Sequence, residues 1–285
     1  MLSGKASKTA LRVAIRRAAH QLMENPQILE DPIALPLLGG GHARDMERAM
    51  HPVARDFRAF MAARSRFAED RLRESVQAGV RQYVILGAGL DTFAYRNPFA
   101  TLRVFEVDFP ATQEWKREML AEAGIRAPQS LTYVPLDFEH KGLCEGLAEA
   151  GFDLAAPAFF TWLGVTPYLT RAAFRATLGA IAAMPAGSGV CFDYALSTES
   201  LSPARRAIFD RLAQRVAAAG EPLQLFFAPE EMDRELRQAG LQRAEQVGTT
   251  ELNALFFDGR EDGLRLSTAD LGRLVVAWVG AATAR

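Results

Sequence analysis

The chain has 285 residues, of which 49% are hydrophobic and 24% are charged, a balance that excludes a disordered chain. Its 33 basic and 34 acidic side chains leave a formal charge of −1, so the composition does not favour a nucleic-acid-binding surface. The two cysteines, with no CxxC pair, exclude a disulfide scaffold or thiolate metal site and favour the reducing cytoplasm. No apolar run approaches the roughly 18 residues that cross a bilayer, so no membrane span is expected.

Residues 1–78 are predicted to form a helical cap. Apolar residues recur at helical spacing over Thr9–Met23, which predicts an amphipathic helix with a basic outer face. Asn25-Pro26 and Asp31-Pro32 break the helical pattern, and Gly39-Gly40-Gly41 forms a flexible joint. Helical periodicity resumes over Asp45–Met50 and Arg55–Val76, with predicted inward positions at Phe57, Phe60, Phe67 and Leu72.

Residues 79–285 are predicted to form an α/β core that shares one compact domain with the cap. Short apolar runs there alternate with helical segments, a pattern typical of a doubly wound, mostly parallel sheet with helices on both faces. The predicted strands are Tyr83–Leu86, Leu102–Val107, Leu131–Leu136, Phe159–Val165, Gly189–Tyr194, Leu241–Val247 and Leu274–Val279. The predicted helices are Ala111–Ala123, Arg171–Met184, Pro203–Ala219 and Pro229–Gln238.

Three strand ends carry residues suited to an adenosine-containing ligand, because ligands of such sheets bind beyond the carboxyl ends of the strands. Gly87 and Gly89 allow a sharp turn and a close backbone approach after the first strand. Asp108 ends the second strand, where an acid accepts hydrogen bonds from ribose hydroxyls. Asp137 and Phe138 follow the third strand and suit an adenine amine and ring.

The ligand is not expected to be a pyrophosphate. The dinucleotide fingerprint needs Gly or Ala where this chain has Thr92, and no P-loop sequence occurs. S-adenosylmethionine fits the remaining description. A nicotinamide-dependent oxidoreductase stays open as an alternative, as does a non-catalytic module that binds an adenosine ligand.

Six segments together resemble the leucine carboxyl methyltransferase family, and its bacterial branch of S-adenosylmethionine-dependent methyltransferases in particular. They are Asp31-Pro32 with its flanks, Arg64–Phe67, Val84–Thr92, Phe105–Pro110, Leu136–Phe138 and Trp162–Leu169. The resemblance spans roughly residues 10–280. It implies a class I methyltransferase, Rossmann-like fold with seven strands, one of them antiparallel, and a helical cap near the active site.

The resemblance also implies which residues hold S-adenosylmethionine. The glycine turn lies under the methionine part, Asp108 binds the ribose, and Asp137 and Phe138 frame the adenine. Arg64 pairs with the cofactor carboxylate, for which Arg66 is the alternative. In this chain Leu163 stands where the family usually has a glutamate of the cofactor pocket. The implied cofactor-binding residues are Arg64, Gly87, Ala88, Gly89, Asp108, Asp137 and Phe138.

The expected reaction is O-methylation of a carboxylate or hydroxyl on a small molecule or peptide. A carboxylate is already ionised near neutral pH, whereas a hydroxyl needs a general base. The sequence contains no clear base motif, which favours a carboxylate, although His42 and His51 of the cap remain possible bases. Tyr168, after the fourth strand, is the expected acceptor-orienting residue. No metal site is expected, and the sequence leaves the oligomeric state open.

Overall fold

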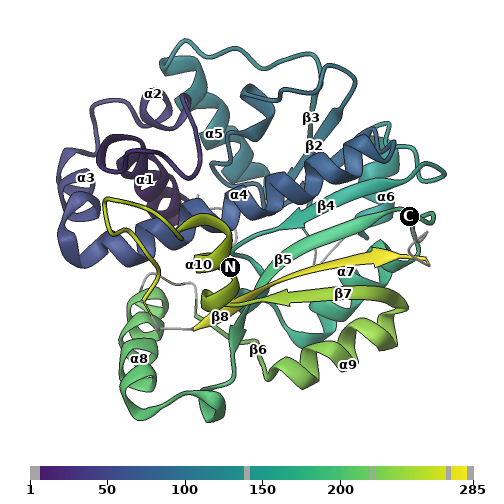
Figure 1. The fold of residues 1–285 in the computed structure, drawn as a ribbon. Helices are drawn as coiled ribbons and strands as arrows, with labels where there is room; N and C mark the ends of the chain where they lie inside the picture. Colours follow the sequence, from purple (N-terminus) through teal and green to yellow (C-terminus); the bar gives the residue numbers. More distant parts are fainter. Residues whose placement is uncertain (1–6, 138–141, 219, 221, 268–270, 281–285) are drawn as a thin grey trace.

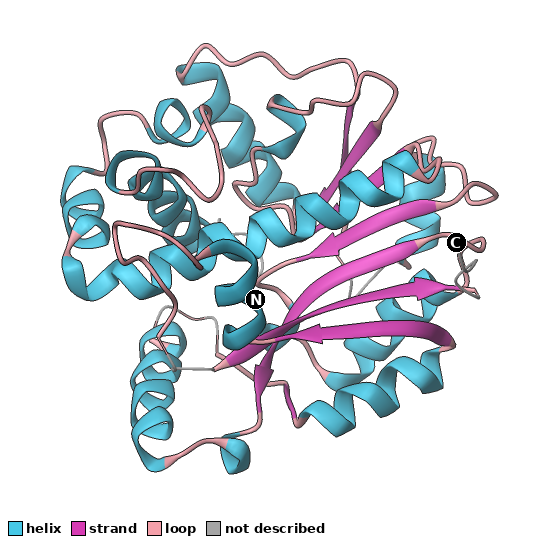
Figure 2. Ribbon diagram, in the orientation of Figure 1, coloured by secondary structure: helices cyan, strands magenta, loops and turns pink. Residues whose placement is uncertain are grey.

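The computed structural model describes residues 7–137, 142–218, 220, 222–267 and 271–280. A mixed sheet is sandwiched between two helical layers, with further helices grouped beyond one end of the sheet (Figures 1 and 2). Within the described residues the helices are α1 (Lys8–Met23), α2 (Ala34–Leu38), α3 (Ala43–Met50), α4 (Arg55–Gln77), α5 (Pro110–Glu122), α6 (Leu143–Glu149), α7 (Arg171–Ala182), α8 (Pro203–Ala217), α9 (Pro229–Ala239) and α10 (Thr249–Phe256).

The sheet confirms the predicted architecture. Its strands run in the order β3-β2-β1-β4-β5-β8-β7, and the two-residue β6 pairs with β5 as an unpredicted eighth strand. Strand β8 is antiparallel to both of its neighbours, whereas the other pairings are parallel. The strands are β1 (Gln82–Leu86), β2 (Arg103–Asp108), β3 (Leu131–Pro135), β4 (Ala158–Trp162), β5 (Gly189–Leu196), β6 (Phe226–Phe227), β7 (Leu241–Val247) and β8 (Gly272–Val279).

Alternate side chains of each central strand enter two different cores. In β1, Val84 and Leu86 join one apolar cluster with residues of α6, α7 and α9. Tyr83 and Ile85 join a second cluster on the other face with residues of α4 and α10. Burial of both strand faces explains why the sequence shows continuous apolar runs rather than alternation.

The cap helices α1 and α3 pack against α4, and α2 packs against α1 and α5 (Figure 1). Helix α1 begins where the Ser7 hydroxyl accepts a hydrogen bond from the Ala10 N–H at 3.1 Å, which satisfies one of the free donors of the first turn. On α4, Phe67 and Leu72 are buried as predicted. The inward prediction for Phe57 is wrong, because this side chain is 39% exposed.

Candidate functional site

The turn after β1 requires glycine at two positions. Gly87 and Gly89 have φ angles of +64° and +47°, and residues that carry a Cβ rarely adopt such backbone angles. A Cβ at Gly87 would overlap the side chain of Val165, and one at Gly89 would lie 2.9 Å from the Cβ of Ala10. The turn is therefore wedged between the loop that follows β4 and the first turns of α1.

Asp108 fixes this turn from the end of β2. Its Oδ2 accepts the Gly89 N–H at 2.5 Å, and its Oδ1 accepts the Phe109 N–H at 2.7 Å. Burial raises the pKa of the Asp108 carboxyl, although the two backbone hydrogen bonds act in the opposite direction. Each carboxylate oxygen keeps a second acceptor position, so the group can also receive ribose hydroxyls.

Arg64 reaches the same place from α4. Its side chain is buried, and Nη1 donates to Asp193 Oδ2 on β5 at 2.7 Å. The other oxygen, Asp193 Oδ1, accepts the Gly164 N–H at 2.5 Å. The Nε of Arg64 is buried and has no hydrogen-bond partner among the described residues. A buried guanidinium donor without a partner fits the carboxylate that the cofactor would bring.

These groups line one cavity, which we call the cofactor cavity. Its walls come from α1, Arg64 and Ser65 of α4, the β1 turn, Asp108 and the loop after β4. The donors and acceptors fit an adenosine cofactor with an amino-acid tail. The free volume is about 100 Å³, below the roughly 300 Å³ at which small-molecule pockets begin. The cavity must therefore widen before it admits a whole cofactor.

The structure assembles most, but not all, of the predicted site. Ala88 and Tyr168 line the cofactor cavity, and Leu163 lies in its wall. Asp137 follows β3 and is half-buried, but it is not among the cavity-lining residues. Phe138 lies outside the described residues.

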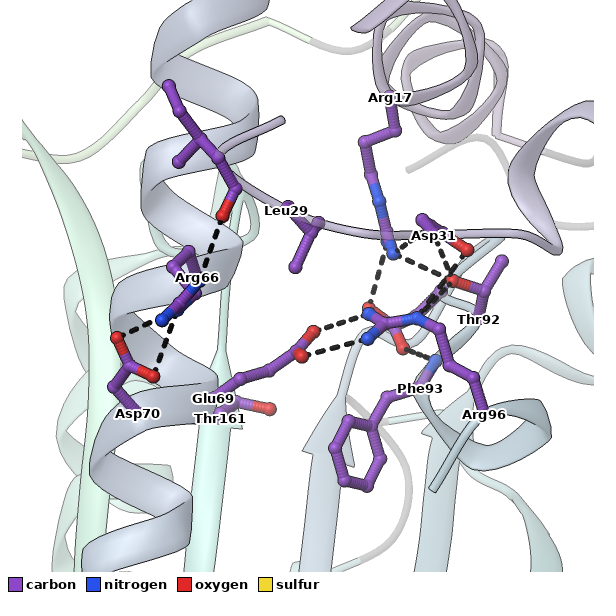
Figure 3. Close-up of polar contacts among 12 residues, drawn as sticks. Arg17, Leu29, Asp31, Arg66, Glu69, Asp70, Thr92, Phe93, Arg96 and Thr161 are labelled. Carbon is purple, nitrogen blue, oxygen red and sulfur yellow. Dashed lines mark hydrogen bonds and ion pairs between the residues drawn. The ribbon is translucent and has the colours of Figure 1, made fainter. Parts of the chain in front are cut away.

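The alternative arginine and the two candidate histidine bases lie outside the cofactor cavity. Arg66 does not line the cofactor cavity and pairs with Asp70, Nε to Oδ2, at 2.9 Å (Figure 3). His42 and His51 flank the two ends of α3, and neither lines the cofactor cavity. Of these two arginines, only Arg64 lines the cofactor cavity.

A buried polar network that the sequence did not predict ties α1 to the β1 turn. Arg17 Nη2 contacts Asp31 Oδ2 at 2.6 Å and Thr92 Oγ1 at 2.7 Å (Figure 3), and Arg17 Nη1 contacts Asp91 Oδ2 at 3.1 Å. Burial would raise the pKa of Asp91, but the nearby arginines and Lys116 outweigh it and hold that pKa below its ordinary value. Arg17 also lines the cofactor cavity.

Thr92 shows why this turn departs from the dinucleotide fingerprint. Its hydroxyl donates to Asp31 Oδ2 at 2.7 Å and accepts from Arg17. On the far side of the network Arg96 pairs with Glu69 of α4 (Figure 3). Thr92, at the last position of the fingerprint, therefore anchors the cap to the β1 turn. The only sequence signal for this contact was Asp31, which is followed by a proline.

Two negative findings apply to the described residues. None of their helices has both the length and the apolar composition of a membrane span. No three of their His, Cys, Asp or Glu side chains are grouped as metal ligands would be.

Known proteins show the same sequence and fold patterns. A family model described as leucine carboxyl methyltransferase matches residues 10–182. The chain is 32% identical to a Bacillus subtilis protein named "Putative S-adenosyl-L-methionine-dependent methyltransferase YktD", over 93% of this chain and 95% of that protein. A Mycobacterium avium protein named "Putative S-adenosyl-L-methionine-dependent methyltransferase" is 36% identical over 70% of this chain and 68% of its own length.

A solved structure agrees on the fold. A Thermobifida fusca protein described as a "putative methyltransferase" superposes with a TM-score of 0.59 at 22% identity, covering 86% of this chain and 92% of that one. A Streptomyces avermitilis protein gives a TM-score of 0.57 at 16% identity, and the match covers 98% of this chain and 100% of that one. At these identities the match concerns the fold alone.

Proposed function

The chain belongs to the leucine carboxyl methyltransferase family, and on that premise we propose that it transfers a methyl group from S-adenosylmethionine to a carboxylate oxygen of an organic acid or peptide. The cofactor supplies an electrophilic methyl group on a sulfonium. The chain's own task is to bind the cofactor, align the acceptor oxygen with that methyl group and exclude water.

The buried donors and acceptors support the cofactor assignment. The β1 turn brings backbone close to the ligand, and Asp108 is fixed where it can accept the ribose hydroxyls. Arg64 offers its unpartnered Nε to the carboxylate end. Leu163 removes one acceptor that the family usually supplies, which is expected to weaken cofactor binding by about 1–2 kcal/mol.

The observation that carries the choice of acceptor is the composition of the cofactor cavity. No histidine, glutamate or lysine is among its lining residues in the described chain. Its two acids are both engaged, Asp108 by backbone N–H groups and Asp91 by Arg17. Without a free general base, the acceptor oxygen should be ionised before it binds, as a carboxylate is near pH 7. Tyr168 is the residue we assign to orienting it.

Calorimetry and product analysis test this assignment. We expect S-adenosylmethionine and S-adenosylhomocysteine to bind and NAD not to bind, because Thr92 stands where the dinucleotide fingerprint requires Gly or Ala. Mass spectrometry of reactions with paired acids and alcohols should show methyl esters but no methyl ethers. Binding of NAD alone would support the oxidoreductase alternative, and binding of none of the three would support a non-catalytic module.

The pH dependence of kcat separates the two acceptor chemistries. A carboxylate acceptor predicts a kcat that is nearly constant between about pH 6 and pH 9, because the acid is ionised throughout that range. A hydroxyl acceptor served by a base predicts a rise in kcat with pH as the base loses its proton. A tenfold rise per pH unit near neutrality would contradict the proposal.

A further inference from the structure

A second and larger cavity lies between the cap and α8. We call it the cap groove; its lining includes Arg12, Arg16, Val53, Phe57, Ile208 and Arg211. Its free volume is about 1000 Å³, at the upper end of the range for small-molecule sites. Figure 1 shows α8 on the same side of the molecule as the cap helices α1 and α3.

Apolar side chains are exposed in the cap groove. Val53 is 86% exposed, Phe57 39% and Ile208 40%. These are three of the seven large hydrophobic residues that the described chain leaves exposed, and they come from two stretches far apart in the sequence, one around the start of α4 and one in α8. Single exposed apolar residues are ordinary, but a group of them around one hollow indicates a surface that binds something.

The same hollow has an excess of positive charge, although the whole chain has a formal charge of −1. Among the described residues, four arginines line it against two carboxylates, those of Asp45 and Glu47. The exposed pair of Arg48 and Asp45, 3.4 Å apart, cancels one charge of each sign. The surplus lies with the arginines of α1 and α8, so charge complementarity favours an anionic occupant.

Arg12 of α1 has a donor that suits such a ligand. Arg16 Nη1 donates to the Arg12 carbonyl oxygen at 2.8 Å, and its guanidinium lies 4.7 Å from the centre of the Phe57 ring. Arg12 Nη1 is buried and lacks a hydrogen-bond partner among the described residues. A donor in this state gains most from an incoming carboxylate, which accepts two parallel hydrogen bonds from a guanidinium.

We propose that the cap groove is a binding site for a free amphipathic carboxylate. Its acid group pairs with Arg12 and Arg16, and its apolar chain covers Val53, Phe57 and Ile208. The site differs from the cofactor cavity, because the two use different faces of α1: Ala10, Val13 and Arg17 line the cofactor cavity, and Arg12, Ile15 and Arg16 line the groove. Both sites can therefore be filled at once.

Calorimetry with decanoate tests this proposal on the full chain. We expect saturable binding at one site, both with and without saturating S-adenosylhomocysteine, and clearly weaker binding of the uncharged methyl decanoate. Arg12→Gln should weaken decanoate binding about tenfold or more, because the acid loses a charged donor. Arg44→Gln is the matched control, since Arg44 is an exposed arginine of α3 that does not line the groove.

A second variant keeps the test independent of α1 folding. Ile208→Asn replaces an exposed position of α8, and it should weaken decanoate binding while leaving S-adenosylhomocysteine affinity unchanged. Absence of saturable binding, equal affinity for the ester, or displacement of decanoate by S-adenosylhomocysteine would overturn the proposal. Self-association that Ile208→Asn abolishes, without decanoate binding, would assign the groove to a second copy of the chain.

Discussion

Arg64 and Asp193 are 129 residues apart in the sequence, yet their Nη1 and Oδ2 atoms lie 2.7 Å apart, with both residues buried. The contact joins α4 to β5, and Asp193 also accepts the N–H of Gly164. Asp193 thus orients the arginine that we assign to the cofactor carboxylate and holds the loop after β4 against it.

Separate variants distinguish the structural role of this pair from its binding role. Arg64→Met should lower the free energy of unfolding by about 3–5 kcal/mol, because it leaves Asp193 buried without a counter-charge. The double variant Arg64→Met with Asp193→Leu should regain much of that loss in urea unfolding. It should still bind S-adenosylhomocysteine at least tenfold more weakly than the parent. Restored binding in the double variant would remove Arg64 from the cofactor site.

Asp108→Ala should weaken S-adenosylmethionine binding by roughly 1–3 kcal/mol, because two ribose hydroxyls and the Gly89 N–H all lose a charged acceptor. Calorimetry measures this change directly. Glu114→Ala, on the exposed face of α5, is the control for loss of one negative charge. If the Asp108 variant is folded and its affinity is unchanged, Asp108 does not bind the ribose.

Gly87→Val should abolish S-adenosylhomocysteine binding, because the new side chain overlaps Val165 and strains a φ of +64°. Gly79→Val is a close comparison, since Gly79 also has a positive φ, +106°, but its Cβ would meet no atom within 4 Å. The Gly79 variant should lose stability by about 1–2 kcal/mol and keep its affinity. Retained micromolar binding by Gly87→Val would show that the turn does not approach the cofactor.

The buried Glu24 should make stability depend on acid pH. Its carboxylate pairs with Arg58 at 2.6 Å and contacts His20 Nδ1 at 2.9 Å. Burial would raise the pKa of Glu24, but hydrogen bonds from His20 and Arg58 outweigh it and lower that pKa below its ordinary value. A lowered folded-state pKa stabilises the fold above the unfolded-state pKa of about 4.3, and this contribution is lost as pH falls through the folded-state value.

Comparison with Glu24→Gln isolates that contribution. The variant should be less stable than the parent by about 3–5 kcal/mol near pH 7, because it leaves Arg58 buried and unpaired. The difference in free energy of unfolding should shrink as pH falls below about 4. Urea unfolding at several pH values measures it, and a difference that does not change down to pH 3 would contradict this role.

The first turns of α1 should exchange amide hydrogens more slowly once cofactor product is bound. Arg17 ties the later part of α1 to Asp31, Asp91 and Thr92, whereas no such network holds the first turns among the described residues. The change should therefore concentrate at residues 8–14, which lie over the small cofactor cavity. Hydrogen exchange with and without S-adenosylhomocysteine measures it. Equal protection of these residues in both states would make α1 a fixed wall.

The sequence by itself determined the order of the elements and the position of the glycine turn. Buried strands between helices must be apolar on both faces, so the runs around Val84 and Val190 identified the parallel sheet. The turn at Gly87 and the acid at Asp108 were predictable because each follows locally from how a strand ends beside its neighbour. These inferences needed only residues that are close together in the sequence or that lie at the ends of strands.

The tertiary structure alone decided which distant charges meet. Nothing local in the sequence pairs Arg64 with Asp193 or Arg17 with Asp31, because such contacts depend on how helices dock on the sheet. The error at Phe57 has the same cause. Helical periodicity places Phe57 and Arg64 on nearly the same face of α4, seven residues apart, but it does not tell what covers each turn of that face. Sheet and loops bury Arg64, whereas the end of the helix leaves Phe57 exposed in the cap groove.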